Sequence, residues 1–404
     1  MCYGVNVYEK QGYNSIMKNA ILVINAGSSS IKFAVFSEEM ETKKLYRGIV
    51  DHISIAPDIV IYDTSKKVVL SRVLSSTDYE QIVTELITSI NLCLKDFTII
   101  AVGHRVVHGG VHYLQPILIN DVVIDDLTKL IPLAPLHQPY NLKIIVALKK
   151  LYPNLSQVAC FDTAFHATQE KLAKMFAIPR KLTQSGVIRY GFHGLSYEYI
   201  ASILSKYVPN NISSGKVIVA HLGNGSSLCA MRQCKSKATS MGFTALEGLM
   251  MGTRTGHLDP GVVLYLLEEL KLTVKQTVHL LYSESGLLGV SGISGDVREL
   301  TESQEPNAEE AIELFCYRAA QEIAALIIPL NGIDALVFTA GIGEHSYIVR
   351  KKICQWFEWM GLSLNEQANK NDAAIISDKD SKIVVAVIPT NEELMIVNHT
   401  MRLI

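Results

Sequence analysis

The chain has 404 residues, 49% of them hydrophobic, and a formal net charge of −2 at pH 7. That length is enough for two domains, each with its own apolar core. The near-neutral charge gives no reason to expect nucleic acid or an anionic membrane as a partner, and no apolar run approaches the length of a membrane-spanning helix.

The first residues and the cysteines indicate the cellular compartment of the protein. Residues 1–16 are polar and aromatic without a continuous apolar core, so they predict an extension rather than a secretory signal, with Met17 as an alternative start. The seven cysteines form no Cys-x-x-Cys pair. This pattern predicts a reduced, cytoplasmic protein with buried thiols rather than a disulfide or zinc framework.

A predicted hairpin opens the chain. Residues 21–24 are apolar and β-branched, and apolar residues alternate with others over 31–35, so both runs are predicted strands. Gly27 and three serines form the turn between them. Such a turn presents N–H groups and hydroxyls to one point, which suits a phosphate, and Lys32 follows as a counter-charge. An ordinary β-hairpin is the alternative reading.

Polar clusters follow two of the next predicted strands. Strands are predicted over 45–55 and 59–74, broken by Pro57 and a turn at 63–65, and over 99–102 and 157–161. Helices are predicted behind a capping box at 77–80 and over 142–151. The third strand runs into the basic loop 103–110, and the fourth ends in the polar cluster 162–166. Ligands bind at strand ends in open α/β sheets, so both clusters are candidate site segments.

The second half repeats the opening pattern. After a tight loop at 189–194 with His193 at its tip, a strand over 216–222, a small polar turn at 223–227 and a strand over 228–232 are predicted. This strand–turn–strand unit resembles the opening hairpin. It predicts a duplicated fold with one phosphate loop in each domain.

A long loop and a glycine-rich turn complete the pattern. Residues 239–260 are rich in glycine and methionine without a clear period, which predicts a long structured loop carrying Arg254. Helices are predicted over 262–281 and 308–328, and strands over 335–339 and 383–388. The turn 341–345 would offer the N–H groups of a helix start to a nucleotide.

Taken together, these motifs resemble those of the acetate kinase family. The matching stretches are residues 25–33, 103–110, 134–137, 161–166, 189–194, 221–225, 252–254, 339–344 and 389–393. They occur in family order and cover the chain from about residue 21 to its end.

The resemblance implies an α/β fold of two duplicated domains of the actin-like, ribonuclease H-like type, with the active site in the cleft between them, and a homodimer. An extension would cover 1–20, the first domain 21–166 with the C-terminal helix 394–404, and the nucleotide-binding domain 167–393. The implied reaction is reversible transfer of the γ-phosphoryl group of ATP to acetate, giving acetyl phosphate, with Mg²⁺ or Mn²⁺.

The chemistry explains the residue types at the implied site. A carboxylic acid is already ionised at pH 7, so it needs no general base, and positive charge, metal and positioning must supply the catalysis. The resemblance implies that Arg105 and Arg254 hold the carboxylate and the migrating phosphoryl group and that His193 donates to that group. Asp162, the family's acid/base residue, is predicted to orient Arg105 or metal-bound waters; a structural capping role is the alternative.

The remaining implied contacts divide by ligand. Val107, Leu136, Phe192 and Ala245 would line an apolar pocket for the methyl group, and Asn25 and Glu392 would hold the metal. The nucleotide would contact Lys32, His221, Leu222, Gly223, Asn224, Gly225, Asp296, Val297, Arg298, Gly341, Ile342, Gly343, Glu344 and His345. The other histidines near these motifs, His104, His108, His137 and His166, are predicted to be core or supporting residues.

Three departures from the family pattern matter. Ala245 stands where the family usually has proline, which predicts a larger pocket that also accepts propionate. His345 replaces an asparagine beside the nucleotide, and His257 replaces an aspartate close to Arg254.

Three other functions compete with an acetate kinase. A propionate or broader short-chain acyl kinase would share the same site. A non-enzymatic, actin-like nucleotide switch would not need the pair Arg105 and Arg254. A sugar kinase would need polar side chains where Val107, Leu136 and Phe192 are apolar.

Overall fold

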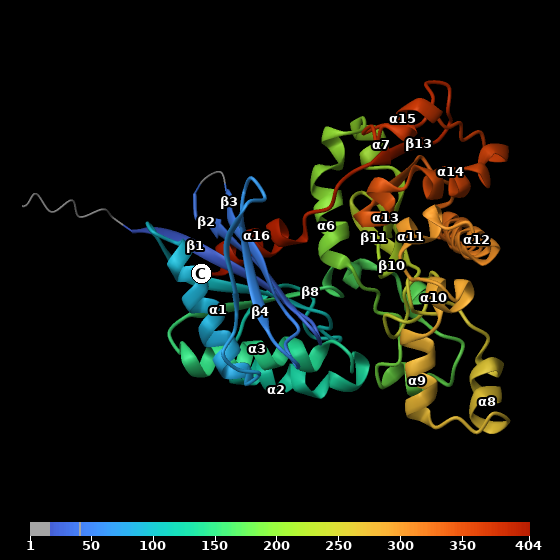
Figure 1. Cartoon of the computed structure of the whole chain (residues 1–404). Coiled ribbons are helices and arrows are strands. Elements are labelled where there is room, and N and C mark those ends of the chain that lie inside the picture. Colours follow the sequence, from blue (N-terminus) through green and yellow to red (C-terminus); the bar gives the residue numbers. More distant parts are fainter. Residues whose placement is uncertain (1–16, 40–41) are drawn as a thin grey trace, which may run out of the picture.

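The computed structural model describes residues 17–39 and 42–404. It forms two lobes, each built on its own sheet (Figure 1). Most of the predicted extension, residues 1–16, lies outside the described residues, but Lys18–Ala20 form the start of the first strand instead of belonging to an extension. None of the helices in the described ranges is long and apolar enough to cross a membrane.

The first sheet has eight strands in the order β5-β4-β3-β2-β1-β6-β8-β7. They are β1 (Lys18–Ala26), β2 (Ile31–Ser37), β3 (Lys44–Asp51), β4 (Asp58–Asp63), β5 (Val68–Val73), β6 (Phe97–Val106), β7 (Ile117–Leu118) and β8 (Ser156–Phe161). The predicted hairpin is confirmed: β1 and β2 pair antiparallel, and the N–H of Gly27 donates to the carbonyl of Ser30 across the turn.

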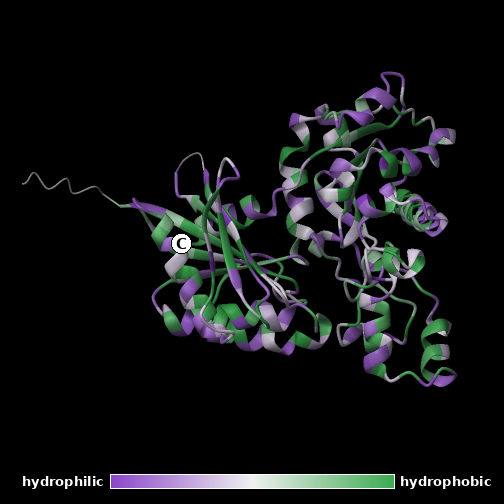
Figure 2. Cartoon of the chain, viewed as in Figure 1, coloured by the Kyte–Doolittle hydropathy of each residue, from purple (hydrophilic) through white to green (hydrophobic). Residues whose placement is uncertain are grey.

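Helices cover both faces of this sheet. On one face lie α1 (Tyr79–Cys93) and α3 (Gln138–Leu151), with α2 (Asp121–Lys129) beside α3. The other face is covered by α16 (Glu392–Leu403), the last helix of the chain. In Figure 2 much of this sheet is green, and its strands β1, β2 and β8 are apolar and largely buried between the two helical layers.

The second sheet has five strands in the order β11-β10-β9-β12-β13. They are β9 (Lys216–Leu222), β10 (Ser226–Arg232), β11 (Lys235–Thr239), β12 (Ala335–Thr339) and β13 (Val384–Val387). As in β3-β2-β1-β6-β8, an antiparallel meander is followed by two strands that pair parallel. The predicted duplication is therefore confirmed by topology.

The helices of the second lobe follow in chain order. They are α4 (Lys171–Lys174), α5 (Arg180–Gln184), α6 (Gly194–Ile203), α7 (Asn210–Ser213), α8 (Pro260–Glu268), α9 (Val274–Ser283), α10 (Gly286–Ser291), α11 (Val297–Glu302), α12 (Pro306–Leu330), α13 (Ala340–His345), α14 (Tyr347–Gln355) and α15 (Glu366–Lys370). α12 packs on one face of the sheet and α6 on the other. Between β11 and α8 the chain has no helix or strand, as predicted for the long loop.

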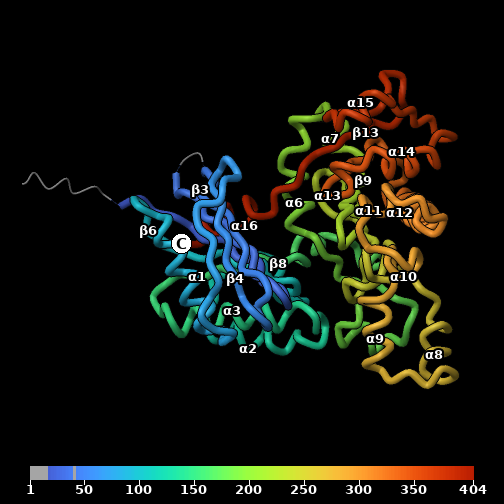
Figure 3. Tube along the Cα trace, in the orientation of Figure 1, coloured from blue at the N-terminus to red at the C-terminus, as the bar shows by residue number. Residues whose placement is uncertain are grey.

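The last segment of the chain crosses between the lobes. In Figure 3 the red tube leaves β13 in the second lobe and ends in α16 against the first. Met395, Ile396 and Val397 of α16 are buried with Ile21 and Val23 of β1. The C-terminal helix thus packs with the first strand.

Three predicted local structures differ from those observed. β6 continues to Val106, because its last residues pair with β8, so Arg105 lies on a strand rather than in a loop. Asp78 caps α1 by accepting from the N–H of Gln81, whereas the predicted capping box began one residue earlier. Residues 341–345 lie inside α13 instead of forming the turn before it.

Candidate functional site

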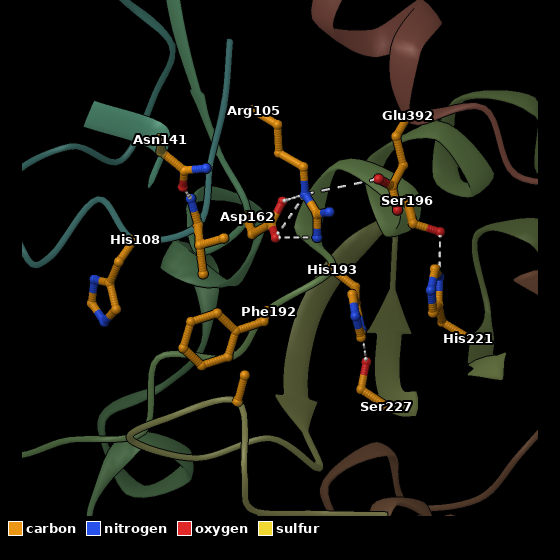
Figure 4. Close-up of polar contacts among 12 residues, drawn as sticks. Arg105, His108, Asn141, Asp162, Phe192, His193, Ser196, His221, Ser227 and Glu392 are labelled. Atoms are coloured by element: carbon orange, nitrogen blue, oxygen red, sulfur yellow. Dashed lines mark hydrogen bonds and ion pairs between the residues drawn. The ribbon is translucent and has the colours of Figure 1, made fainter. Parts of the chain in front are cut away.

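An arginine–carboxylate cluster lies where the two lobes meet. Arg105 from β6 makes a bidentate contact with Asp162, which follows β8, with 2.7 Å between Nη2 and Oδ2 and 3.0 Å between Nε and Oδ1 (Figure 4). Glu392 at the start of α16 lies 3.9 Å from Nε. Burial acts to lower the pKa of Arg105, but the charges of Asp162 and Glu392 outweigh it and raise that pKa. The cluster therefore presents a fixed guanidinium cation.

His193 is held in an unusual backbone conformation directly before α6. Its φ is +56°, in the left-handed region that few side chains other than glycine adopt. The next N–H, of Gly194, donates to the carbonyl of Asp162, and a Cβ at Gly194 would lie only 2.1 Å from that oxygen. Close contact between the two loops thus places His193 beside the arginine–carboxylate cluster.

Hydrogen bonds determine which ring nitrogen of His193 carries the proton. Tyr197 is fully buried, and its hydroxyl lies 2.5 Å from Ser227 Oγ, which lies 2.8 Å from His193 Nδ1. Ser227 is the acceptor available to the Tyr197 proton within the described chain, so the Ser227 proton is free for Nδ1. Burial and the neighbouring charges of His221 and Arg105 lower the pKa of His193 well below its usual value. The network therefore assigns a neutral ring with its proton on Nε2.

Two donors converge beside Gly225. A methyl group built on Gly225 would lie 3.4 Å from His193 Nε2 and 3.6 Å from Arg254 Nη2. Arg254 donates through Nη1 to the carbonyl of Ala245 at 2.9 Å, and none of the ion pairs among the described residues involves it. A partly buried cation without an anion is costly, and Arg254 is only partly exposed. The space beside Gly225 therefore suits an anionic group.

A small apolar cluster adjoins this space. Val107, Phe192 and Ala245 of the predicted pocket lie together, joined by Ala134, Met241 and Met251, which the sequence analysis did not select. Leu136, by contrast, is 41% exposed and lies outside this cluster, because it sits in a turn before α3. The structure therefore brings together three of the four predicted pocket residues.

Asn141 supports this pocket and was also missed from sequence. Its Oδ1 accepts from the N–H of Val107 at 3.1 Å, and its Nδ2 donates to the carbonyl of Ala26 at 2.8 Å. It thereby ties the pocket to the opening hairpin. An asparagine on the buried face of an amphipathic helix is the signal that could have identified it.

A second cavity, of about 600 Å³, lies in the second lobe. It is lined by predicted nucleotide residues, namely Gly223, Asn224, Asp296, Val297, Arg298, Gly341, Ile342 and His345, and also by Thr301, Ser346 and Tyr347, which were not predicted. Other predicted nucleotide residues lie elsewhere: Lys32 lines a different cavity, and His221, Leu222, Gly225, Gly343 and Glu344 do not line this one. His221 instead stacks on His193, with 4.2 Å between ring centroids.

The predicted metal residues share a third cavity, of about 370 Å³. Asn25, Glu392, Lys32 and Arg105 all line it. Within the described residues no three His, Cys, Asp or Glu side chains gather as a ready-made metal cage. One amide and one carboxylate oxygen fit Mg²⁺, which keeps several waters and uses few protein ligands.

Comparisons with known proteins agree on one family. A family model described as the acetokinase family matches residues 20–398. The chain is 49% identical over 393 residues to an acetate kinase of Rhodopseudomonas palustris (strain TIE-1), covering 96% of this chain and 99% of that protein.

Solved structures give the same result. A propionate kinase from Francisella tularensis subsp. tularensis SCHU S4 matches with a TM-score of 0.88 and 38% identity, covering 96% of this chain and 100% of that one. An acetate kinase from Porphyromonas gingivalis matches with a TM-score of 0.87 and 36% identity, covering 95% and 99%.

Proposed function

The chain belongs to the acetokinase family, and on that premise we propose that Arg105, Arg254 and His193 transfer the γ-phosphoryl group of ATP directly to acetate. Members of this family are phosphotransferases with a carboxyl group as acceptor, which use a nucleotide co-substrate and a divalent metal. The observation that carries the proposal is the convergence of His193 Nε2 and Arg254 Nη2 beside Gly225.

This arrangement suits transfer to an acceptor that is already an anion. Arg105 is held by Asp162, and Arg254 forms no ion pair within residues 17–39 and 42–404. Their two charges offset the repulsion between carboxylate and triphosphate. The Nε2–H group of His193 donates a hydrogen bond to the equatorial oxygens of the moving phosphoryl group. In the transition state the charge of the phosphoryl group spreads over these oxygens. No residue has to remove a proton from the acceptor.

We further assign the nucleoside to the cavity between α11 and α13, and the metal to the cavity of Asn25 and Glu392. Mg²⁺, or Mn²⁺ in its place, would neutralise phosphate charge there. The free, mostly buried cysteines of the described residues agree with a cytoplasmic location.

Hydroxamate detection of acyl phosphate with a panel of short carboxylates tests the proposed function. We expect ATP- and metal-dependent hydroxamate with acetate and propionate. Because sugar phosphates form no hydroxamate, ADP release is measured in parallel, and it should occur with these carboxylates and not with sugars. ADP release with sugars alone, or no transfer to any acceptor, would refute the proposed function.

Propionate is a second candidate substrate, because Ala245 leaves room in the apolar pocket for its extra methylene. Ala245 packs against the apolar cluster, and within the described chain its N–H donates no hydrogen bond, so proline can replace it without losing one. Proline would refill the pocket. Since a buried methylene is worth about 0.8 kcal/mol, we expect Ala245→Pro to lower the propionate-to-acetate ratio of kcat/KM by roughly fourfold.

Steady-state kinetics with acetate, propionate and butyrate measure this ratio in both proteins. A ratio that does not move would show that Ala245 does not set pocket size. Similar losses for all three substrates would indicate a displaced Arg254, because the carbonyl of Ala245 holds that side chain.

Removal of either predicted metal ligand should raise the metal requirement. We expect Asn25→Ala and Glu392→Ala each to raise the Mg²⁺ concentration for half-maximal activity by about tenfold or more. The two residues lie at opposite ends of the chain but line one cavity. Magnesium titrations unchanged in both variants would refute the shared site.

We also propose a homodimer formed through α8 and α9. These helices and the turn between them expose apolar side chains in the described structure: Val262, Leu264, Tyr265, Leu270, Val274 and Val278. Burying such a face against a second copy is favourable. In sedimentation, we expect the wild type and Leu92→Asp, an exposed site on α1, to be dimers and Leu264→Asp to be a monomer. A monomeric wild type would exclude the assignment.

A further inference from the structure

Glu344 belongs to the glycine-rich motif beside the nucleotide cavity, yet its carboxylate is used by the main chain. Oε1 accepts from the N–H of Ala340 at 2.9 Å and from the N–H of Thr390 at 3.1 Å. The side chain is only 16% exposed and does not line the cavity. A nucleotide contact through Glu344, which the family resemblance implied, is therefore not what this geometry favours.

Both N–H groups depend on this carboxylate. Ala340 begins α13, where the first N–H groups have no partner within the helix, and its φ of +64° is a left-handed conformation that alanine rarely adopts. Thr390 follows the last strand, past the ladder bonds of the sheet. One side-chain oxygen accepts from both N–H groups, so Glu344 fixes both positions together.

Thr390 is also held through its side chain. Its Oγ1 lies 2.8 Å from Ser196 Oγ, which lies 2.8 Å from Nδ1 of the buried His221 (Figure 4 shows the Ser196–His221 contact). Just before it, the N–H of Ile388 donates to the carbonyl of Phe338 on β12. The chain is thus fixed to the second lobe up to Thr390.

Two residues later the chain has reached the first lobe. Glu392 begins α16, lies 3.9 Å from Arg105 Nε and lines the cavity shared with Asn25. Thr390 is therefore the last residue hydrogen-bonded to the second lobe before Glu392, the residue assigned to the metal. A link of two residues allows Glu392 little movement relative to Thr390, since each residue spans at most about 3.6 Å.

We propose that Glu344 is a positioning residue that fixes the 389–392 segment, and with it Glu392, relative to α13 at the nucleotide cavity. It acts through the backbone of Thr390 and touches neither nucleotide nor metal. The role of Glu392 rests on the proposed function, but the anchoring of the segment does not.

Three substitutions of Glu344 distinguish the effect of side-chain length from the effect of the carboxylate charge. Glu344→Gln keeps a side-chain oxygen at the same reach without the charge; Glu344→Asp keeps the charge but is one methylene shorter; Glu344→Ala removes both. Glu366→Ala, which removes an exposed carboxylate paired with Lys351 on α14, is the control. An anchor needs reach, so Gln should retain function and Asp should lose it.

Amide hydrogen exchange of the ligand-free protein measures how firmly Glu344 holds the segment, and it does not require enzymatic activity. We expect exchange of the segment 388–391 to accelerate at least tenfold in Glu344→Ala and Glu344→Asp, and less than threefold in Glu344→Gln and the control. Unchanged exchange in Glu344→Ala would overturn the proposal. If Glu344→Ala does not fold, the comparison of Asp with Gln still decides.

Activity supplies the second measurement. We expect Ala and Asp, but not Gln, to raise the Mg²⁺ requirement as Glu392→Ala does, with no further rise when Glu344→Ala is added to Glu392→Ala. A rise in KM for ATP in Glu344→Gln would instead show direct nucleotide contact and refute the proposal. If the exchange rates change as expected but the protein phosphorylates no carboxylate, the proposed function is refuted and the anchoring role of Glu344 stands.

Discussion

Arg254→Ala should lower kcat by about a thousandfold or more while the fold survives. Arg254 is the cation that meets His193 Nε2 beside Gly225 and has no anionic partner in the described structure. Its charge is therefore available to the group being transferred. Because that group gains charge on its oxygens in the transition state, the loss should appear in kcat more than in KM.

The measurement needs a control for folding and for general loss of positive charge. Arg232→Ala, at an exposed position at the end of β10, should keep the wild-type rate. Both variants should melt within a few degrees of wild type, since neither arginine forms an ion pair among the described residues and Arg254 is only partly buried. If purified Arg254→Ala kept more than about a tenth of wild-type kcat, the transition-state role would be wrong.

The second large effect concerns Asp162, whose side-chain hydrogen bonds among the described residues all come from Arg105. We expect Arg105→Ala to lose about a thousandfold and Asp162→Ala about a hundredfold, because a guanidinium freed from its carboxylate is displaced. If Asp162 acts only by orienting Arg105, the double variant should be no slower than Arg105→Ala alone.

An independent acid/base role gives a different result. The two losses would then multiply, and the double variant would be about a hundredfold slower than Arg105→Ala. Single-turnover rates of all four proteins decide between these roles. The control is Asp126→Ala, which removes a carboxylate paired with Lys129 in the first lobe and should leave the rate unchanged.

What the sequence could predict was mostly local. The turn after Ala26 and its counterpart after Leu222 follow from small residues between apolar runs, and those patterns alone implied the duplication. The long loop before α8 followed from its lack of period. In such places neighbouring residues determine the structure.

What it could not predict depends on residues far along the chain. Gly103 looked like the start of a loop, but a Cβ there would lie 2.4 Å from Thr400 Oγ1, so this glycine lets α16 approach a continuous strand. The acceptor role of Glu344 depends on Thr390, 46 residues later. Leu136 is apolar yet 41% exposed, and its place in a turn before α3 was not visible in the residue type.

The position of α16 has a consequence for biosynthesis. The helix that completes one face of the first sheet, burying Ile396 against Ile21 and Val23, is synthesised only after the whole second lobe. Domains generally fold in order from the N-terminus as they are made. Here the N-terminal sheet must wait, with that face uncovered, until the second lobe has been synthesised. A chain stopped before Glu392 would present that apolar face to other molecules, so premature termination yields an aggregation-prone product rather than a folded half.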